Sequence, residues 1–366
     1  MTQKSMEIRA AAKTYHVTAT DDVQTIRSVT ALADAFFVID LNVYNLHREL
    51  FEGISKESLY LLKAIEADKT VQTALDICER MMTMPAKRNA TLVSFGGGII
   101  QDITGFAANI LYRGIRWIFV PTTLLAACDS CIGGKTSLNY KGYKNLLGTF
   151  FPPDEIYIYP PFFHTLSHRD LVSGLGEIVK FNLMQDERSV DGLEKSMPLL
   201  LSGEPQVLNS FILSSLRFKR RFIEEDEFDR GERMKLNFAH TFGHAYEAAS
   251  GYEIPHGIAV SMGMVTANYI SVKRGLLSRS LAGRLEAVLW SVIKVSAQSG
   301  PFDCDAIVSA IHRDKKQTGR QITAILLAED HSLHIVHDIK VDEISEAIQY
   351  LSDHLTKEPA MGGAWQ

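Results

Sequence analysis

The feature that most constrains the fold is a change of pattern near the middle of the chain. Up to about residue 160, short apolar runs alternate with helical patterns. From about Thr165 onward nearly every segment has helical character, with a 3.6-residue period over residues 205–223 and 281–298. We therefore predict an α/β domain over residues 1–160 and a helical domain over residues 161–366, with the boundary near Pro160-Pro161.

Three apolar runs in the first domain predict buried parallel strands: Ala35–Asp40, Thr91–Phe95 and Trp117–Val120. We also expect strands within residues 7–18 and a helix over residues 70–85. The first apolar run ends in the carboxylate of Asp40, and open α/β sheets bind ligands at the carboxyl ends of their strands. Asp40 is therefore a candidate ligand contact.

The second run leads into three consecutive glycines and then a helical pattern. Gly96, Gly97 and Gly98 would let the backbone approach a pyrophosphate, and the N-terminus of the following helix favours negative charge. The spacing is not the common GxGxxG, so a tight strand-to-helix turn is the alternative interpretation. After the third run, the hydroxyls of Thr122 and Thr123 are placed to contact a ribose or a phosphate, or to cap a helix.

A second glycine-rich stretch, Gly133-Gly134-Lys135-Thr136, follows Asp129-Ser130 and precedes Lys144-Asn145. Glycines with lysines are typical of a loop that binds an anion, although the spacing is not that of a P-loop. Cys128 and Cys131 lie nearby with CxxC spacing. The chain has no second CxxC motif, so we interpret them as small buried residues rather than as a redox or zinc site.

The helical domain carries residues suited to a metal ion. His240 and His244 are four residues apart and share one face of a helix, and His256 follows after a turn with glycine and proline. Upstream, Glu177 is the best candidate for a carboxylate ligand. Two imidazoles, a carboxylate and an open position suit a catalytic Zn²⁺ or a similar divalent ion. The alternative is a pair of packed helices with hydrogen-bonded core histidines.

Composition narrows the classes of partner and compartment. The 38 basic and 43 acidic residues give a net charge of −5, which argues against a nucleic-acid partner. No apolar run reaches the length of a membrane span, and the first residues lack the apolar core of a signal peptide. Because the 366 residues include only four cysteines, we expect a reducing, cytoplasmic location.

Taken in order, the motifs resemble those of the 3-dehydroquinate synthases and, more broadly, of the sugar-phosphate cyclases. The resemblance extends from about Asp40 to Leu327. It rests on Gly96-Gly97-Gly98 with Asp102, Arg113-Gly114, Pro121-Thr122-Thr123, Asp129-Ser130 with Gly133-Gly134-Lys135-Thr136, Lys144-Asn145, Glu177 with Lys180, His240-Thr241-Phe242-Gly243-His244, His256-Gly257 and Asp314-Lys315-Lys316.

The resemblance implies an α/β N-terminal NAD-binding domain, an all-α C-terminal metal-binding domain and an active site between them. It implies a homodimer, an NAD that is reduced and re-oxidised within one turnover, and Zn²⁺ or Co²⁺ bound by Glu177, His240 and His256. The residues that it assigns to NAD are Asp40, Glu66, Lys69, Gly96, Gly97, Gly98, Asp102, Thr122, Thr123, Asp129 and Lys144. Those around the substrate phosphate are Lys135, Asn145, Lys180, His244 and, acting in a partner subunit, Arg113. Those that face the substrate's carboxylate and hydroxyls are Lys219, Arg233, Asn237 and Lys316.

The implied reaction converts a sugar phosphate to a carbocycle. The metal polarises a substrate hydroxyl and eases hydride loss to NAD, the resulting ketone acidifies the adjacent C–H, and phosphate leaves. NADH then returns the hydride, and an aldol step closes the ring. Because Arg233 offers a planar guanidinium to a carboxylate, we favour 3-deoxy-D-arabino-heptulosonate 7-phosphate as the substrate.

Three alternatives stay open. A specialised cyclase of the aminodehydroquinate or 2-epi-5-epi-valiolone synthase type is favoured by departures from the family pattern at Ile65, Gln101, Ile258 and Tyr140–Tyr143. Ile258 stands where the family usually has an acidic residue, whose loss would change the orientation of a metal ligand. A glycerol-type alcohol dehydrogenase would release NADH, and a non-catalytic NAD sensor would lack metal ligands.

Overall fold

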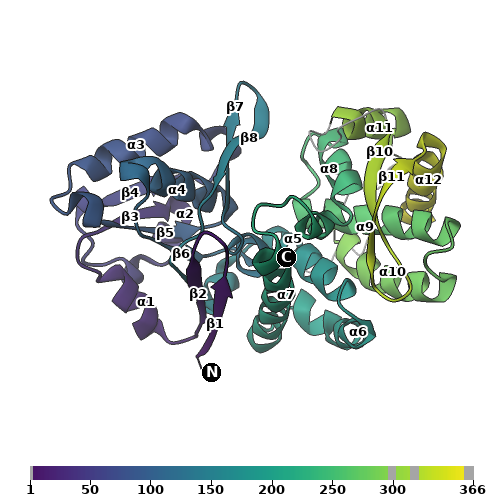
Figure 1. The fold of residues 1–366 in the computed structure, drawn as a ribbon. Coiled ribbons are helices and arrows are strands. Elements are labelled where there is room, and N and C mark those ends of the chain that lie inside the picture. The colour runs from purple at the N-terminus through teal and green to yellow at the C-terminus, as the bar shows by residue number, and fades with distance from the viewer. Residues whose placement is uncertain (1–2, 296–301, 314–320, 358–366) are drawn as a thin grey trace. The chain divides into compact units, whose positions relative to one another are not determined.

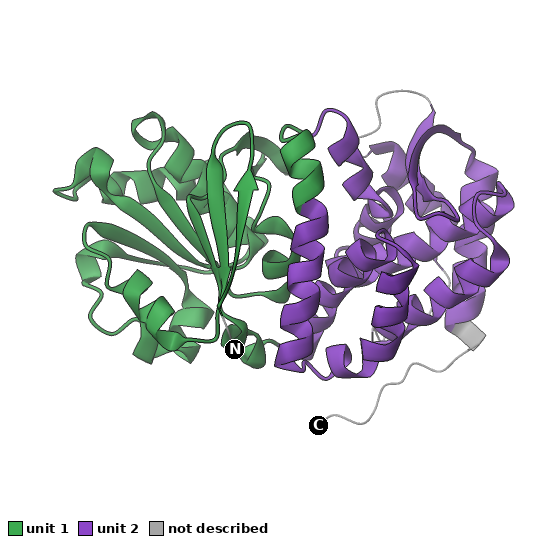
Figure 2. Cartoon of the chain, turned by 60° about the horizontal axis from the view of Figure 1, so that its bottom comes forward, with its two compact units in different colours: residues 1–166, 220–228 green, residues 167–219, 229–366 purple. Residues whose placement is uncertain are grey.

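The computed structural model describes residues 3–295, 302–313 and 321–357, and the chain divides into two compact units. The first comprises residues 1–166 and 220–228, and the second comprises residues 167–219 and 229–366 (Figure 2). The linear boundary that we predicted near residue 160 does not anticipate the segment 220–228. That segment belongs to the first unit because the end of a long helix contacts the first strand, where Arg220 donates to the carbonyl of Glu7 at 3.3 Å.

A seven-stranded sheet forms the centre of the first unit (Figure 1). Its order is β1-β2-β9-β6-β5-β3-β4, with β1 Lys4–Arg9, β2 Thr14–Ala19, β3 Ala35–Asp40, β4 Leu59–Leu62, β5 Thr91–Gly96, β6 Trp117–Pro121 and β9 Glu155–Ile158. Neighbouring strands are parallel except for β1 and β2. β3, β5 and β6 are buried almost throughout, which confirms the three predicted buried parallel strands.

The helices of the first unit are α1 Val23–Thr30, α2 Leu41–Leu46, α3 Val71–Met82 and α4 Gly98–Ile110. α4 begins directly after the glycine turn and packs on β3, β5 and β6. A hairpin of β7 Lys135–Tyr140 and β8 Tyr143–Phe150 also packs on α4. A Cβ at Gly105 would lie only 2.7 Å from Cγ2 of Thr136, so the helix reaches the hairpin because it has a glycine there.

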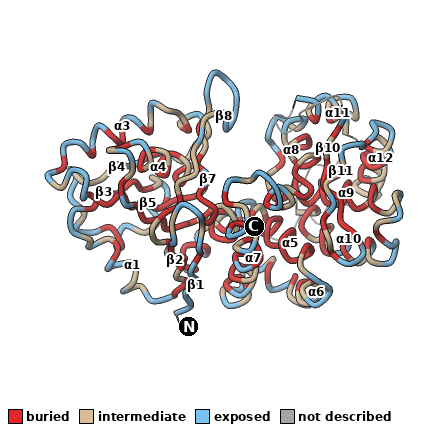
Figure 3. Tube along the Cα trace, in the orientation of Figure 1, coloured by how far each residue is buried: buried red, intermediate tan, exposed pale blue. Residues whose placement is uncertain are grey.

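The second unit is helical apart from one hairpin within its described residues. Its elements are α5 His168–Leu183, α6 Glu187–Leu201, most of α7 Pro205–Glu225, α8 His240–Ala249, α9 His256–Lys273, α10 Arg279–Ile293, α11 Cys304–Arg313, β10 Ile322–Leu327, β11 Leu333–Ile339 and α12 Val341–Lys357. α9 is the central helix: 14 of its 18 residues are buried, and α5, α8, α10 and α12 pack around it (Figure 3). Among the described residues, no helix has the length and apolar composition needed to cross a bilayer.

Glycines let α9 approach α5 and α8 at backbone distance. A Cβ on Gly176 of α5 would overlap the carbonyl oxygen of Gly257, and a Cβ on Gly257 would overlap that of Ser173. On the other side of α9, a Cβ on Gly263 would overlap the carbonyl oxygen of Ala239, just before α8. The first two contacts place the beginning of α9 beside the middle of α5, and the third places the beginning of α8 beside the middle of α9.

Candidate metal centre and cofactor site

Three helices of the second unit supply the candidate metal ligands. Glu177 lies in the middle of α5, His240 is the first residue of α8 and His256 is the first residue of α9. The chain enters α8 through Ala239, whose φ of 69° is left-handed and therefore strained for a residue with a Cβ. The structure thus brings together three residues that are far apart in the sequence.

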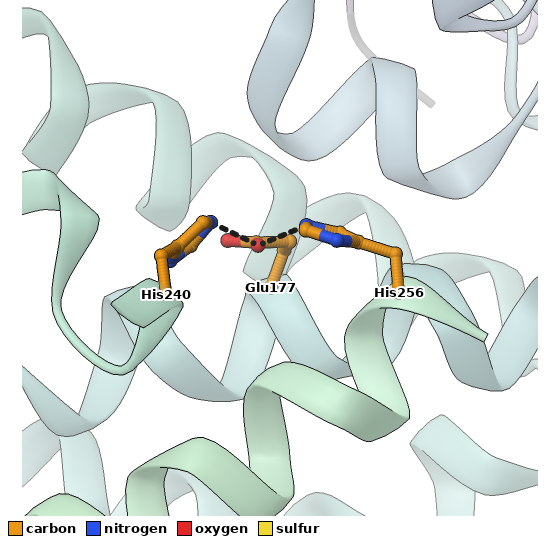
Figure 4. A group of neighbouring side chains, drawn as sticks. All are labelled: Glu177, His240 and His256. Atoms are coloured by element: carbon orange, nitrogen blue, oxygen red, sulfur yellow. Dashed lines mark hydrogen bonds and ion pairs between the residues drawn. The ribbon is translucent and has the colours of Figure 1, made fainter. Parts of the chain in front are cut away.

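The donor atoms have the spacing that a divalent ion needs. Oε1 of Glu177 lies 3.3 Å from Nε2 of His240 and 3.1 Å from Nε2 of His256, and the side chains point toward one another (Figure 4). A tetrahedral Zn²⁺ with bonds of about 2.1 Å holds its ligand atoms about 3.4 Å apart. Glu177 is completely buried, so its charge requires a partner. The three side chains therefore fit a bound cation.

Each imidazole has its second nitrogen beside an acceptor. Nδ1 of His240 lies 3.0 Å from the carbonyl oxygen of Phe238, and Nδ1 of His256 lies 3.2 Å from Oε2 of Glu247. A ring nitrogen that donates its proton to an acceptor leaves the lone pair on the other nitrogen. Without an ion, burial would lower the pKa of His256, but the carboxylates of Glu177 and Glu247 outweigh burial and raise that pKa to about 10. With an ion bound, each ring would keep its proton on Nδ1 and present the Nε2 lone pair to the metal.

Lys180 makes the surroundings of Glu177 cationic. Its Nζ lies 2.6 Å from Oε2 of Glu177 and donates to the carbonyl of Leu236 at 3.0 Å. Burial alone would raise the pKa of the Glu177 carboxyl, but the charge of Lys180 and the contacts with the histidines outweigh it and hold that pKa well below 4.5. Burial and the charge of Lys180 lower the pKa of His240 to about 3. An ionised carboxylate and a neutral imidazole are the protonation states that metal ligands need.

In the first unit, polar groups predicted to contact NAD gather at one edge of the sheet. Asp40, the Gly96–Gly98 turn and Thr122 follow the carboxyl ends of β3, β5 and β6, which are neighbours. No described side chain caps α4, whose first amides are therefore available to a phosphate. Oγ1 of Thr122 is buried and has no hydrogen-bond partner among the described residues. These features fit a dinucleotide.

A second polar network lies beside the β7–β8 hairpin. Nζ of Lys69 lies 2.6 Å from Oδ2 of Asp102 and donates to Oδ1 of Asn145 at 2.6 Å. Oγ of Ser137 lies 2.7 Å from Oδ2 of Asp102 and 2.8 Å from Oδ1 of Asn145. Burial raises the pKa of Asp102 above 3.8, although Lys69 and Ser137 oppose the shift. Residues that we predicted to contact NAD (Lys69 and Asp102) and the substrate phosphate (Asn145) therefore form one network.

The remaining predicted residues are distributed over both units. Lys219 is buried on α7, and Arg233 is buried on the 3₁₀ segment Glu232–Asn237, which also contains Asn237. The ring of His244 lies 5.2 Å from that of His240 between centroids. In the first unit, Lys135 and Lys144 are exposed on the β7–β8 hairpin, and Arg113 is exposed after α4. Asp129 lies in the π-helical turn Ala126–Ser130, and Thr123 follows β6. Glu66 accepts a hydrogen bond from Asn139 at 2.8 Å. The roles of these residues stay predictions, and Lys316 lies outside the described residues.

Two functional candidates were missed in the sequence. Glu247 follows His240 by seven residues and His244 by three, a helical spacing that places all three on one face of α8 and that could have revealed it. Ser137 had no such signal, because its contacts depend on the register of the β7–β8 hairpin. Gln101, which departs from the family pattern, has a structural contact. Its side chain donates to the carbonyl of Ser130 and accepts from the Ser130 hydroxyl, both at 2.6 Å, and so connects α4 to the π-helical turn.

Comparison with known proteins decides the family. Models of the 3-dehydroquinate synthase N-terminal and C-terminal regions match residues 59–173 and 174–317. A 3-dehydroquinate synthase from Dictyoglomus thermophilum is 37% identical over 316 residues, which cover 86% of this chain and 88% of that protein. One from Streptococcus sanguinis is 37% identical over 291 residues, or 78% of this chain and 79% of that protein. The chain belongs to the 3-dehydroquinate synthase family.

Solved structures confirm the predicted fold class for this family member. A 2-epi-5-epi-valiolone synthase from Streptomyces hygroscopicus subsp. jinggangensis, with NAD⁺ and Zn²⁺ bound, is 27% identical and has a TM-score of 0.82 over 93% of this chain and 97% of that one. A 2-deoxy-scyllo-inosose synthase complexed with carbaglucose-6-phosphate, NAD⁺ and Co²⁺ has a TM-score of 0.80 over 95% of this chain and 100% of that one; at 24% identity it shows the fold alone. A probable glycerol dehydrogenase from Sinorhizobium meliloti, 12% identical with a TM-score of 0.62 over 92% of this chain and 96% of that one, also shows only the fold.

Proposed function

We propose that this protein is a carbon–oxygen lyase that converts 3-deoxy-D-arabino-heptulosonate 7-phosphate to 3-dehydroquinate and phosphate, with NAD and Zn²⁺ or Co²⁺ as cofactors. The observation that carries the proposal is the convergence of Glu177, His240 and His256 on one point, where Oε1 of Glu177 lies 3.3 Å and 3.1 Å from Nε2 of the two histidines. The 3-dehydroquinate synthases among its relatives support the reaction class. The valiolone synthase with NAD⁺ and Zn²⁺ bound supports both cofactors.

The chain's own residues prepare the site for this chemistry. When bound, a divalent ion would supply Lewis acidity to a substrate hydroxyl, and NAD would supply the hydride acceptor. Lys180 keeps Glu177 ionised, and the carbonyl of Phe238 fixes the ring of His240. The burial of Glu177 excludes water, so that charges in the site act through a low dielectric.

A buried guanidinium supports a substrate that carries a carboxylate. Arg233 is 3% exposed, and it lies on the segment whose Leu236 carbonyl accepts from Lys180. Guanidinium planes bind carboxylates with two parallel hydrogen bonds, a geometry that matches the carboxylate of the proposed substrate. We assign Lys219, Asn237 and Lys316 to the same end of the substrate.

The phosphate contacts and the assembly complete the proposal. We assign the substrate phosphate to Lys135, Asn145, Lys180 and His244, and to Arg113 from a second copy of this chain in a homodimer. Arg113 is exposed at the end of a 3₁₀ turn, where it can reach another molecule. We further propose a cytoplasmic enzyme that acts on neither nucleic acid nor membranes.

A phosphate-release assay tests the function directly. The purified protein with NAD and Zn²⁺ is given the heptulosonate 7-phosphate, sedoheptulose 7-phosphate or glucose 6-phosphate in turn, with product identification. We expect phosphate from the first substrate only, and no net NADH absorbance. Phosphate from either of the other two would indicate a specialised cyclase, and accumulating NADH would indicate a dehydrogenase.

Two variants test the residue roles. Arg233→Ala should lower kcat/KM for the carboxylate substrate by at least about 100-fold, because a buried charged contact is lost, while NAD affinity stays unchanged. Equal losses in both quantities would contradict the role of Arg233. His256→Ala should remove the metal, and stoichiometric Zn²⁺ by elemental analysis would contradict that ligand assignment.

A further inference from the structure

Glu247 is a carboxylate at the metal site that the ligand assignment does not use. It lies on α8, and its Oε2 is 3.2 Å from Nδ1 of His256. On the opposite side of the same ring, Nε2 lies 3.1 Å from Oε1 of Glu177. The ring of His256 is therefore held between two carboxylates that come from different helices.

We propose that Glu247 is a positioning residue that fixes the orientation and tautomer of His256 and so sets the affinity of the site for its ion. The inference rests on the divalent ion of the proposed function. A carboxylate that accepts the proton of Nδ1 keeps the Nε2 lone pair directed at the metal and increases the basicity of that nitrogen. Glu247 would thus act on the metal through His256 without touching it.

The two imidazoles differ in how firmly packing holds them. The side chain of His240 is only 11% exposed, and its Nδ1 is held by a backbone carbonyl that no substitution removes. The side chain of His256 is 26% exposed and stands at the first position of α9. Packing confines the second ring less, so its orientation depends more on a side-chain partner. Ile258, two residues along α9, is apolar and buried and offers no polar group.

The geometry also defines a competing arrangement. His244, Glu247 and His256 form a second group whose ligand atoms all lie within 4.8 Å of one another. There Glu247 would bind the ion itself, and Nδ1 of His256 would be the donor atom. The buried position of Glu177 between two Nε2 atoms favours our assignment, and the two arrangements predict different results for the same variants.

The test measures zinc affinity in the metal-free full-length protein. Zn²⁺ dissociation constants are determined by competition with a chromophoric chelator for Glu247→Ala, for Glu247→Gln and for the control Glu286→Gln. Glu286 is a matched carboxylate in the same unit, which accepts from the hydroxyl of Tyr350 at 2.7 Å. We expect zinc binding to weaken about 10–100-fold in the alanine variant and less in the glutamine variant, whose amide oxygen still accepts from Nδ1. The control and the NAD affinity of all variants should match the wild type.

Several results would overturn the proposal. Wild-type zinc affinity in Glu247→Ala would do so, as would a loss of zinc in Glu247→Ala with retention in Glu177→Gln, because the second group would then hold the ion. If Glu247→Ala does not fold, nitrogen NMR of the zinc-loaded wild type decides: a proton on Nδ1 of His256 supports the proposal, and a proton on Nε2 refutes it. Absence of phosphate release with the zinc effect intact would reject the proposed reaction and leave this inference standing.

Discussion

Each unit contains a carboxylate that is largely removed from solvent and lies next to a lysine, and the two carboxylates behave in opposite ways. Asp102 lies 2.6 Å from Lys69 in the first unit, and Glu177 lies 2.6 Å from Lys180 in the second. Burial raises the pKa of Asp102, whereas the surroundings of Glu177 hold its pKa well below 4.5 against the effect of burial. The distance to the lysine is therefore not what separates them.

The kind of neighbour makes the difference. In addition to its lysine, Glu177 faces two imidazoles, which can carry charge. Among the described residues, Asp102 otherwise faces only the neutral hydroxyl and backbone of Ser137, and its lysine is shared, because Lys69 also donates to the amide oxygen of Asn145. Desolvation of an ion costs several kcal/mol, so one shared lysine compensates it less than a lysine with two imidazoles. The second unit thus keeps a buried negative charge ready for a cation, and the first keeps a carboxylate that is easier to neutralise.

The largest effect should come from removing the charge of the second carboxylate. Glu177→Gln preserves the shape of the side chain but replaces an anionic ligand with a neutral one. We expect zinc affinity to fall about 1,000-fold, since the roughly 10–16 kcal/mol of a zinc site is spread over a few ligands. Competition with a chelator measures the zinc dissociation constant. An unchanged value would show that the negative charge of Glu177 is not used to bind a cation.

Removing the lysine of the Lys69–Asp102 ion pair in the first unit should destabilise the fold. Lys69→Met leaves the partly buried Asp102 without its cation, and we expect a loss of about 2 kcal/mol in the free energy of unfolding, measured with urea. The double variant Lys69→Met/Asp102→Asn should recover most of that loss because no buried charge remains. A single-variant loss below about 1 kcal/mol would show that Asp102 is already neutral in the folded wild type.

The smallest effect concerns a third carboxylate, which has no cation partner among its described contacts. Burial raises the pKa of Asp40 above 3.8, although the amide of Asn42 opposes the shift. A raised folded-state pKa favours the protonated form, so this group's contribution to stability is greatest below pH 3.8 and is lost as the pH rises through the folded-state value. Asp40→Asn keeps a side-chain oxygen that can accept from the amide of Asn42 but removes the charge. The variant should therefore be more stable than the wild type at neutral pH, by on the order of 1 kcal/mol or less. Urea unfolding of the NAD-free protein at pH 4 and pH 7 checks this, and a gain that does not grow with pH would contradict it.

The sequence predicted what depends on local pattern and on chemical type. The buried strands followed from apolar runs, and the grouping of Glu177 with His256, 79 residues apart, followed from the needs of a divalent ion. Contacts set by tertiary register were not predictable in this way. Asn145 lies on β8 and meets Lys69, and the β7–β8 pairing shifts register between Leu138 and Tyr140. No local sequence pattern predicts either feature. Similarly, the end of α7 belongs to the first unit through contacts with β1 that periodicity does not reveal.

The glycines at the crossing of α5 and α9 have a consequence for how such a protein evolves. Gly176 and Gly257 each precede or follow a candidate ligand by one position, and neither leaves room for a methyl group. By letting the two backbones touch, they set the distance between Glu177 and His256, although they take no part in any reaction. A substitution of one metal ligand by another can change which ion the site binds. A side chain at either glycine would instead push the helices apart and prevent the binding of any ion. Inactivating substitutions should therefore be as frequent at these two chemically silent positions as at the histidines.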